Sequence, residues 1–272
     1  MGDPTVADLL REGQEVDLLD RQVLLAEAAG RSRAWLLAHG EQWLDPAVVQ
    51  RYQDWLQRRR QHEPLAYILG YREFWSMKLR VTPDTLIPRP ETELMVETAL
   101  ALIPPERPGS VLDLGTGSGA IALAIASERP RAHIIATDQS AAALEVARAN
   151  ARRLGLDRVK FVQSSWYEAV PGQRFELICA NPPYVASNSP YLDNPELQHE
   201  PRSALVAGDD GLDDIRIIFH GLASHLRQGG SLLLEHGFDQ RDAILGIVPP
   251  GFQCRFIDDL AGQPRLVQLT QV

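Results

Sequence analysis

From about residue 90 to the end of the chain, short apolar runs alternate with longer amphipathic ones. Strands are predicted at "SVLDLG", "HIIATD", "VKFVQS", "FELICA" and "SLLLEHG", and helices at "SGAIALAIASE" and "SAAALEVARANARRLG". This alternation is typical of a parallel α/β sheet with helices on both faces. The last two predicted strands, "FQCRFIDD" and "PRLVQLT", are separated only by a short turn. A hairpin joins strands that run in opposite directions, so we expect one antiparallel strand at this end of the sheet.

The first part of the chain has a different pattern. Residues 1–73 contain short amphipathic segments joined by glycine and polar turns, which predicts a small helical bundle. In "FWSMKLRV", apolar residues such as Trp75 and Met77 alternate with polar ones, as in a half-buried strand. A proline-rich stretch follows, so we expect a β-hairpin linker over 74–89 and the α/β domain over 90–272.

Charge and composition narrow the choice of partners. The formal net charge of −9 disfavours broad attraction to nucleic-acid phosphates. The one obvious positive run, Arg58–Arg60, falls near a predicted helix end, where we interpret it as a solvated cap. We see no signal peptide and no apolar run long enough to span a bilayer, so we expect a cytoplasmic protein that uses no membrane. The cysteines, Cys179 and Cys254, lie in apolar runs and indicate reduced core thiols, and the histidine spacing predicts no metal site.

The stretch "LDLGTGSGA" places a glycine-rich turn between the first predicted strand of the sheet and its helix. Glycines allow a tight turn and let a ligand approach the backbone, although a turn without a ligand would look the same. Asp138 ends the next strand, about 20 residues after the last glycine, where a carboxylate can accept both ribose hydroxyls of a nucleoside. Asp138 could also merely cap the helix that starts at Ser140. The turn and the acid together favour a nucleoside site.

The glycine turn differs from two common nucleotide-binding motifs. It reads G-T-G-S-G after Asp113 rather than G-x-G-x-x-G, and no phosphate-binding lysine follows it. D-x-G-x-G-x-G together with a terminal hairpin resembles the S-adenosylmethionine-dependent methyltransferases. This resemblance implies a seven-stranded, mostly parallel Rossmann-like sheet whose last strand is inserted antiparallel. It also implies that S-adenosylmethionine lies over the first two strands.

A second motif follows the fourth predicted strand of the sheet, where "LICANPPYVA" places Asn181, Pro182, Pro183 and Tyr184. Ligands of parallel sheets bind at the carboxyl ends of the strands. "NPPY" resembles the motif of methyltransferases that act on planar, conjugated NH2 groups, whose delocalised lone pair makes nitrogen a poor nucleophile. The side-chain carbonyl of Asn181 and the backbone carbonyl of Pro182 would hold the NH2 group and stabilise its developing charge, while Tyr184 offers an apolar face. Adenine, cytosine, guanine and a glutamine amide all fit this chemistry.

Six stretches make the resemblance more specific. "EPLAYILGYREFW", "LIPRPETE", "LDLGTGSGAIALAIASERP", "NPPYV", "EPRSALVAGDDGL" and "LLLEHG" occur in this order between about residues 60 and 240. Together they are similar to the release-factor glutamine methyltransferases (the PrmC/HemK family). The resemblance implies methyl transfer to the side-chain amide nitrogen (N5) of the glutamine in the Gly-Gly-Gln motif of bacterial class 1 peptide chain release factors 1 and 2.

The resemblance also implies roles for individual residues. The cofactor would be held by Gly115, Thr116, Gly117, Ser118, Gly119, Asp138, Trp166 and Asn181, with Trp166 near the adenine. The glutamine would be held by Asn181, Pro182, Pro183 and Tyr184, of which Asn181, Pro182 and Tyr184 would be catalytic. Residues 1–73 would dock the protein substrate, because the cofactor and acceptor motifs all lie downstream.

Two other classes of function stay open. A nucleic-acid amino-methyltransferase acting on adenine N6 or guanine N2 shares "NPPY", but the acidic balance and the absence of a basic, aromatic-interleaved extension favour a protein substrate. A cofactor-binding regulator without catalysis would have no need for the acceptor residues beside the glycine turn. The segment "SNSPYLDNPELQHEP" is less similar to the family, so its substrate contacts are not predicted.

Overall fold

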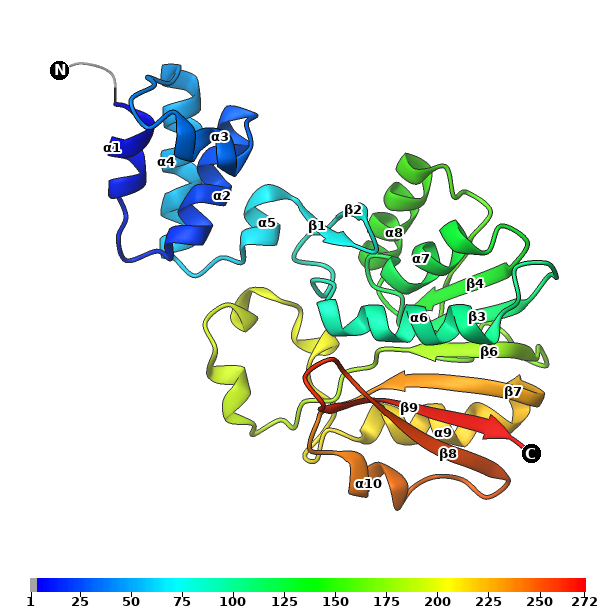
Figure 1. The fold of residues 1–272 in the computed structure, drawn as a ribbon. Coiled ribbons are helices and arrows are strands. Elements are labelled where there is room, and N and C mark those ends of the chain that lie inside the picture. The colour runs from blue at the N-terminus through cyan, green and yellow to red at the C-terminus, as the bar shows by residue number, and fades with distance from the viewer. Residues whose placement is uncertain (1–3) are drawn as a thin grey trace. The chain divides into compact units, whose positions relative to one another are not determined.

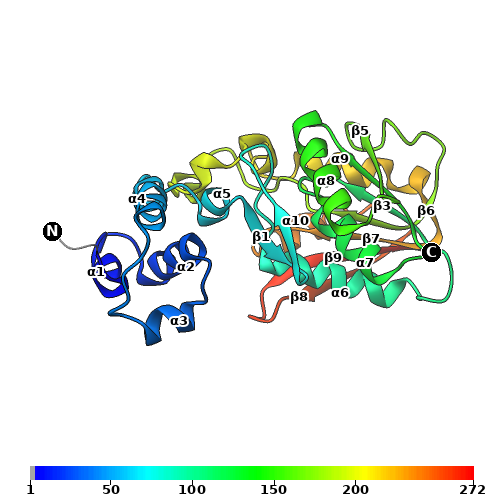
Figure 2. The same cartoon turned by 90° about the horizontal axis from the view of Figure 1, so that it is seen from above.

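The computed structural model describes residues 4–272, which form two compact units (Figure 1, Figure 2). One unit is the described chain up to Gly70 together with Pro195–His199, and the other is Tyr71–Asn194 with Glu200–Val272. The presence of two compact units does not show which function each part of the chain has. The predicted division into three functional segments therefore stays a prediction.

Short helices surround one apolar core in the smaller unit. They are α1 (Val6–Arg11), α2 (Leu18–Ala29), α3 (Arg33–Ala38), α4 (Pro46–Arg60) and α5 (Leu65–Leu69). Asp45 caps α4 by accepting a hydrogen bond from the Ala47 N–H at 2.8 Å, and proline occupies the first helical turn. Tyr52 lies at the centre of the core, where its hydroxyl donates to the Leu9 carbonyl at 3.2 Å. The predicted small helical bundle is confirmed.

Arg58–Arg60 lie in the last turn of α4, as predicted, but the interpretation of the run as a solvated cap is wrong for Arg59. Arg59 Nε lies 2.6 Å from Asp20 Oδ2, and Arg59 Nη2 lies 2.5 Å from Glu196 Oε1. The Arg59 side chain is only 16% exposed. Arg58 and Arg60 each pair with another acid of the same unit. The partners of Arg59 and Arg60 are distant in the sequence and are not revealed by the local pattern, whereas the partner of Arg58, Glu63, lies five residues away.

The larger unit begins with a two-stranded antiparallel hairpin of β1 (Tyr71–Phe74) and β2 (Met77–Arg80). The stretch "FWSMKLRV" is not one strand as predicted, because Trp75 and Ser76 form a turn with φ of +49° and +57°. Two successive left-handed residues match the twist of a hairpin, but this turn usually carries Asn or Gly. Asn150 holds the second strand by accepting from the Arg80 N–H at 2.7 Å and donating to the Arg80 carbonyl at 3.0 Å.

A seven-stranded sheet forms the centre of the larger unit (Figure 1). Its strands are β3 (Ser110–Leu114), β4 (His133–Asp138), β5 (Lys160–Gln163), β6 (Phe175–Ala180), β7 (Leu226–Glu235), β8 (Phe252–Asp258) and β9 (Pro264–Gln271). Their order is β5-β4-β3-β6-β7-β9-β8. Neighbours are parallel from β5 to β7, and β9 is antiparallel to both β7 and β8. The predicted mostly parallel sheet with a terminal antiparallel hairpin is confirmed.

Helices cover both faces of this sheet. Their bounds are α6 (Glu93–Leu102), α7 (Ala120–Glu128), α8 (Ala141–Leu154), α9 (Asp213–His225) and α10 (Arg241–Leu245). Single 3-10 turns are η1 (Pro90–Thr92), η2 (Pro190–Asp193), η3 (Leu197–His199) and η4 (Arg202–Ala204). The adjacent β3 residues Val111 and Leu112 enter different cores, the first with α6, α7 and α8 and the second with α9 and α10. The carboxyl ends of the central strands lie between these two layers.

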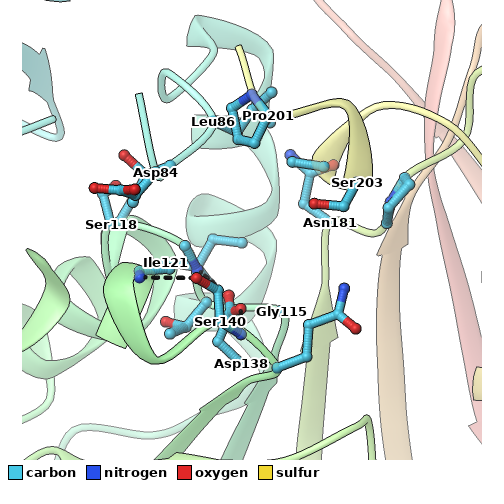
Figure 3. A pocket seen from close by; sticks show the side chains of 18 of the residues that line it. Asp84, Leu86, Gly115, Ser118, Ile121, Asp138, Ser140, Asn181, Pro201 and Ser203 are labelled. Carbon is cyan, nitrogen blue, oxygen red and sulfur yellow. Dashed lines mark hydrogen bonds between the residues drawn. The ribbon is translucent and has the colours of Figure 1, made fainter. Parts of the chain in front are cut away.

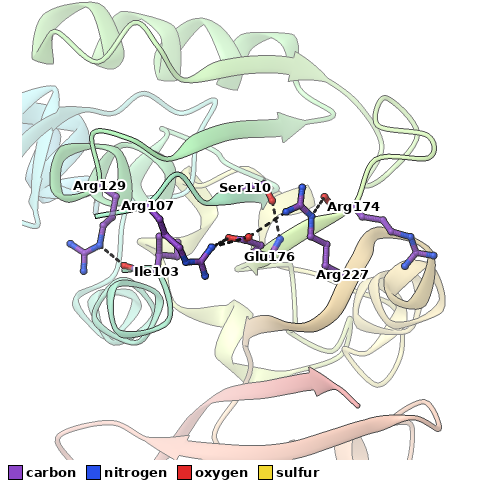
Figure 4. Close-up of polar contacts among 7 residues, drawn as sticks. All are labelled: Ile103, Arg107, Ser110, Arg129, Arg174, Glu176 and Arg227. Carbon is purple, nitrogen blue, oxygen red and sulfur yellow. Dashed lines mark hydrogen bonds and ion pairs between the residues drawn. The ribbon is translucent and has the colours of Figure 1, made fainter. Parts of the chain in front are cut away.

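Arginines gather around one carboxylate at the amino ends of β3 and β6 (Figure 4). Arg107 Nη1 lies 2.9 Å from both oxygens of Glu176, and Arg227 Nη1 lies 3.3 Å from Glu176 Oε1. Arg129 donates to carbonyls at the end of α6, and Arg174 donates to carbonyls at the end of α9. The cations at this edge therefore bind acids and helix ends of their own chain.

Cys179 and Cys254 are free thiols; Cys179 is buried in the core, whereas Cys254 is only partly buried at its edge. No helix between residues 4 and 272 combines the length and the apolar character needed to cross a membrane.

Candidate active site

The glycine-rich turn lies between β3 and α7, at the carboxyl end of β3. Gly115, Gly117 and Gly119 have φ of +70°, +53° and +87°, which is the left-handed region that favours glycine. At Gly119 an added Cβ would lie 3.0 Å from Leu123 and 3.3 Å from Ala147. A side chain there would push against both α7 and α8. Conformation and space together account for a glycine at this position.

Thr116 ties the turn to the sheet. Its Oγ1 donates to Asp113 Oδ2 at 2.6 Å, and its N–H donates to the Thr137 carbonyl at 2.9 Å. Asp113 is fully buried, and desolvation raises its pKa to about 7 although the hydrogen bond from Thr116 opposes the rise. Asp113 does not line the cavity described below. Its carboxyl group supports the turn from behind.

Asp138 ends β4 beside the glycine turn. One of its oxygens accepts from the Gly117 N–H at 2.9 Å, and the other accepts from the Ser140 N–H at 2.9 Å. Burial raises the pKa of Asp138, and the two N–H donors oppose that rise. Each carboxylate oxygen has a second lone pair. The carboxylate is thus fixed at the start of α8 and can still accept hydrogen bonds from a ligand.

Trp166 follows β5 and has an unusual backbone with φ of +46°. Its indole ring lies over Gly115, where an added Cβ would be 3.6 Å from Trp166 Cζ3. Burial raises the pKa of the Asp214 carboxyl group at the start of α9, and the nearby Trp166 indole opposes that rise. The ring therefore lies beside both the glycine turn and the start of α9.

A cavity of about 300 Å³ lies at the carboxyl ends of the central strands (Figure 3). The predicted residues that line it are Gly115, Thr116, Gly117, Ser118, Asp138, Trp166, Asn181 and Pro183. Gly119, Pro182 and Tyr184 were predicted for the site but are not among the lining residues. Lining residues that the sequence reasoning missed include Asp84, Leu86, Thr92, Ile121, Pro201, Ser203 and Asp214. Within residues 4–272, no group of three His, Cys, Asp or Glu side chains is placed to hold a metal ion.

Asn181 directly follows β6 and faces this cavity (Figure 3). Its Nδ2 donates to Thr92 Oγ1 at 3.2 Å. Its Oδ1 is buried and has no hydrogen-bond partner among the described residues. The next side chain, Pro182, is buried. Tyr184 points its hydroxyl to Glu235 at 3.3 Å and belongs to the edge of the core that contains α9.

The buried carboxylate of Glu200 connects two segments that line the cavity and that the sequence analysis did not predict. Glu200 Oε2 accepts from the Ile87 N–H at 3.0 Å, and Glu200 Oε1 accepts from Arg89 Nη2 at 2.6 Å. The Glu200 side chain is 1% exposed and that of Arg89 is 29% exposed. This pair holds the stretch around Leu86 against the stretch around Pro201, and so fixes one wall of the cavity.

Thr92 and Glu235 were not predicted to belong to the site, although both lie in motifs that the sequence analysis names. Glu235 ends the apolar run of "SLLLEHG", and a carboxylate next to such a run is rarely buried unless it is paired. An acid beside an apolar run was therefore the one sequence feature that could have pointed to Glu235. Its partner Thr92 is 143 residues away in the chain, so no local pattern could have connected the two.

Comparisons with known proteins agree with the motifs. The family model "PrmC N-terminal domain" matches residues 5–70, and "Methyltransferase small domain" matches residues 91–196. A Xylella fastidiosa (strain Temecula1) protein named release factor glutamine methyltransferase is 47% identical over 239 residues, which is 88% of this chain and 87% of the relative. The protein of that name from Escherichia coli (strain K12) is 47% identical over 225 residues, covering 83% and 81%. That from Pseudomonas aeruginosa is 46% identical over 268 residues, covering 96% and 97%.

Solved structures share the fold. A methyltransferase from Pyrococcus furiosus has a TM-score of 0.55 at 18% identity, covering 79% of this chain and 98% of that chain. A Thermus thermophilus 16S rRNA N2 G1207 methyltransferase, solved with AdoMet and guanosine, has a TM-score of 0.55 at 20% identity, covering 74% and 50%. These likenesses show the Rossmann-like methyltransferase fold alone. Because relatives at 46–47% identity extend over most of its length and carry one activity in their names, the chain belongs to the family of release factor glutamine methyltransferases.

Proposed function

We propose that the chain transfers a methyl group from S-adenosylmethionine to the side-chain amide nitrogen (N5) of the glutamine in the Gly-Gly-Gln motif of bacterial class 1 release factors. The observation that carries this proposal is the single cavity that brings the glycine turn, Asp138 and Asn181 together. A nucleoside-type site and an acceptor site for N–H groups thus share one space. Relatives named for this activity match the chain over most of its length.

The groups around the cavity fit S-adenosylmethionine. The turn over Gly115–Gly119 lets a ligand come close to the backbone, and Asp138 keeps lone pairs for two ribose hydroxyls. Trp166 offers a flat ring for adenine beside Gly115. A neighbour of the same fold was solved with AdoMet. When bound, the cofactor supplies an electrophilic methyl group carried on a positively charged sulfur.

Asn181 and Pro182 act on the nitrogen that receives the methyl group. The lone pair of a glutamine amide is delocalised, so the nitrogen needs help to become a nucleophile. Asn181 Oδ1 accepts one N–H and the Pro182 carbonyl accepts the other, which orients the nitrogen and stabilises the positive charge that develops on it. Pro183, which lines the cavity, supplies apolar surface to the planar amide, whereas Tyr184 does not line the cavity and donates its hydroxyl proton to Glu235. The methylated, protonated amide is strongly acidic, so its proton passes to water without a lysine or histidine base.

We propose release factors 1 and 2 as the protein substrates, without direct contact to nucleic acid, and the cytoplasm as the place of the reaction. The net charge of −9 supports a protein substrate. We assign docking of the substrate to residues 1–73. Apolar side chains exposed on this part, among them Leu18 at 50%, Leu37 at 67% and Trp43 at 60%, support that assignment.

Transfer of labelled methyl from S-adenosylmethionine tests the proposal. Purified release factor is compared with DNA, RNA, ribosomes and a release factor whose motif glutamine is replaced by glutamate. We expect label on the unmodified release factor, at the motif glutamine, and none on the other four. Equal labelling of the glutamate-substituted factor, or labelling of nucleic acid in its place, would contradict the proposed substrate.

A further inference from the structure

Four polar side chains of the larger unit form one hydrogen-bonded series, which begins at the cavity wall with Asn181 and Thr92 and continues away from the cavity to Glu235 and Tyr184. Asn181 Nδ2 donates to Thr92 Oγ1 at 3.2 Å, and Thr92 Oγ1 donates to Glu235 Oε2 at 2.6 Å. Tyr184 Oη donates to Glu235 Oε1 at 3.3 Å. Thr92 and Glu235 are each 3% exposed. The proposed function uses Asn181 but gives no task to the two buried groups behind it.

Each member of the series limits what the next one can do. A carboxylate can only accept hydrogen bonds, and Glu235 receives two hydroxyl protons. Burial raises the pKa of Glu235, while the hydroxyl groups of Thr92 and Tyr184 oppose the rise. Thr92 has a single hydroxyl proton and gives it to Glu235, so it can offer Asn181 only a lone pair. Asn181 must therefore turn its NH2 group to Thr92.

This restriction decides which end of the Asn181 amide faces the cavity. The two ends of an asparagine amide have almost the same size, so packing alone hardly distinguishes them. With its NH2 group committed to Thr92, Asn181 presents the carbonyl oxygen, and that oxygen is buried without a partner in the described chain. A reversed amide would place two donors opposite each other when an N–H group of a substrate approached.

We propose that Thr92 and Glu235 are positioning residues that hold the carbonyl oxygen of Asn181 toward the acceptor nitrogen, and that they thereby restrict the reaction to groups that carry an N–H. This inference rests on the proposed function. It explains why the site accepts an amide and not a carboxylate: the hydrogen bonds from Asn181 to Thr92 and from Thr92 to Glu235 fix the direction of the Asn181 side chain. A glutamate side chain would set a carboxylate oxygen against Asn181 Oδ1, which two acceptors oppose.

Substitution of Thr92 separates positioning from packing. Thr92→Val keeps the shape and removes the hydroxyl, so Asn181 loses its fixed orientation. We expect kcat to fall about 10–100-fold, while KM for the release factor and Kd for S-adenosylmethionine change by less than about twofold. Thr92→Ser restores the hydroxyl and should return kcat to within about threefold of the wild type. Thr98→Val, which removes a hydroxyl from the following helix α6 away from the cavity, is the matched control and should leave kcat unchanged.

Glu235→Gln tests the series at its other end. A glutamine of similar size can donate its NH2 to Thr92, which frees the hydroxyl proton for Asn181 Oδ1 and favours the reversed amide. We expect kcat to fall as it does in Thr92→Val. This variant also covers the case in which Thr92→Val does not fold.

A second readout does not depend on methyl transfer. The Asn181 side-chain amide resonances of 15N-labelled protein are identified by their absence in Asn181→Asp. Their protons should exchange with water at least about 10-fold faster in Thr92→Val than in the wild type or in Thr98→Val. Unchanged exchange in Thr92→Val, a wild-type kcat in the folded variants, or failure of Thr92→Ser to restore kcat would overturn the inference. If the wild type transfers no methyl group to release factor, the proposed function fails, and the exchange rates still decide the orientation of Asn181.

Discussion

The ion pair between Arg89 and Glu200 should contribute much more to stability than the surface pairs of this protein. Glu200 is 1% exposed, so Arg89→Met leaves a carboxylate in the interior without its cation. Removing one partner of a buried pair costs about 3–5 kcal/mol. Arg89 is 29% exposed and water screens part of the interaction, so we expect a loss of about 2–3 kcal/mol in the free energy of unfolding.

A double-mutant cycle makes the test specific. Glu200→Gln keeps an acceptor for the Ile87 N–H but gives up the charge, which should cost about 1.5–3 kcal/mol. With both substitutions no buried charge is left unpaired, so the double variant should lose about 1–2 kcal/mol less than the two single losses combined. Urea unfolding of the larger unit at pH 7 measures these differences. The control Arg148→Met removes an exposed partner of Glu145 and should cost less than about 1 kcal/mol.

The same variants connect stability with the cavity. Arg89→Met loosens the wall around Leu86 and Pro201, so S-adenosylmethionine should bind several-fold more weakly by calorimetry. Strict additivity of Arg89→Met and Glu200→Gln would show that the two side chains do not interact. A loss in Arg89→Met no larger than that in Arg148→Met would refute the reasoning from burial.

Three further predictions concern the site. Asp138→Ala should weaken S-adenosylmethionine binding by about 1.5–3 kcal/mol in calorimetry, and unchanged affinity in a folded variant would mean that the ribose is held elsewhere. Asn181→Ala should lower kcat by about 10²–10³ in single-turnover assays while cofactor affinity changes less, and a wild-type rate with both partners bound would rule out the mechanism. The pKa of Asp113 is raised by burial to about 7, so the stability from its protonated form is present at low pH and is lost as the pH rises to about 7. Between pH 5 and pH 8 the free energy of unfolding should therefore fall by about 2–3 kcal/mol more in the wild type than in Asp113→Asn. This free energy is measured by urea unfolding at each pH, and the same pH dependence in both proteins would contradict the raised pKa.

The local chemistry of the sequence determined the architecture and most of the cofactor site. The apolar period of each strand, the cap at Ser140 and the stop at Gly155 are short-range features, and the structure has strands and helices where they predict them. The ends of two strands could also be predicted, because Asp138 and Asn181 each follow an apolar run that is typical of a buried strand. Parallel strands bring their carboxyl ends to one edge, so residues at those ends meet in one cavity.

Other features were decided only by the tertiary structure. The turn at Trp75 and Ser76 carries no usual turn residue, and the hairpin around it is held by contacts such as those of Asn150. Glu196 is 137 residues from Arg59 in the sequence and still binds it.

The polar groups behind the cavity follow the same rule. Glu200 lies 111 residues from Arg89, and Glu235 lies 143 residues from Thr92. Propensity and capping act over a few neighbouring residues, and their marks are visible in a linear pattern. A buried charge or hydroxyl must instead find its partner wherever the folded chain supplies one, because leaving it unpaired away from water costs more than the bond itself gains. Sequence position therefore determined where the reacting groups lie, and three-dimensional burial determined which way they face.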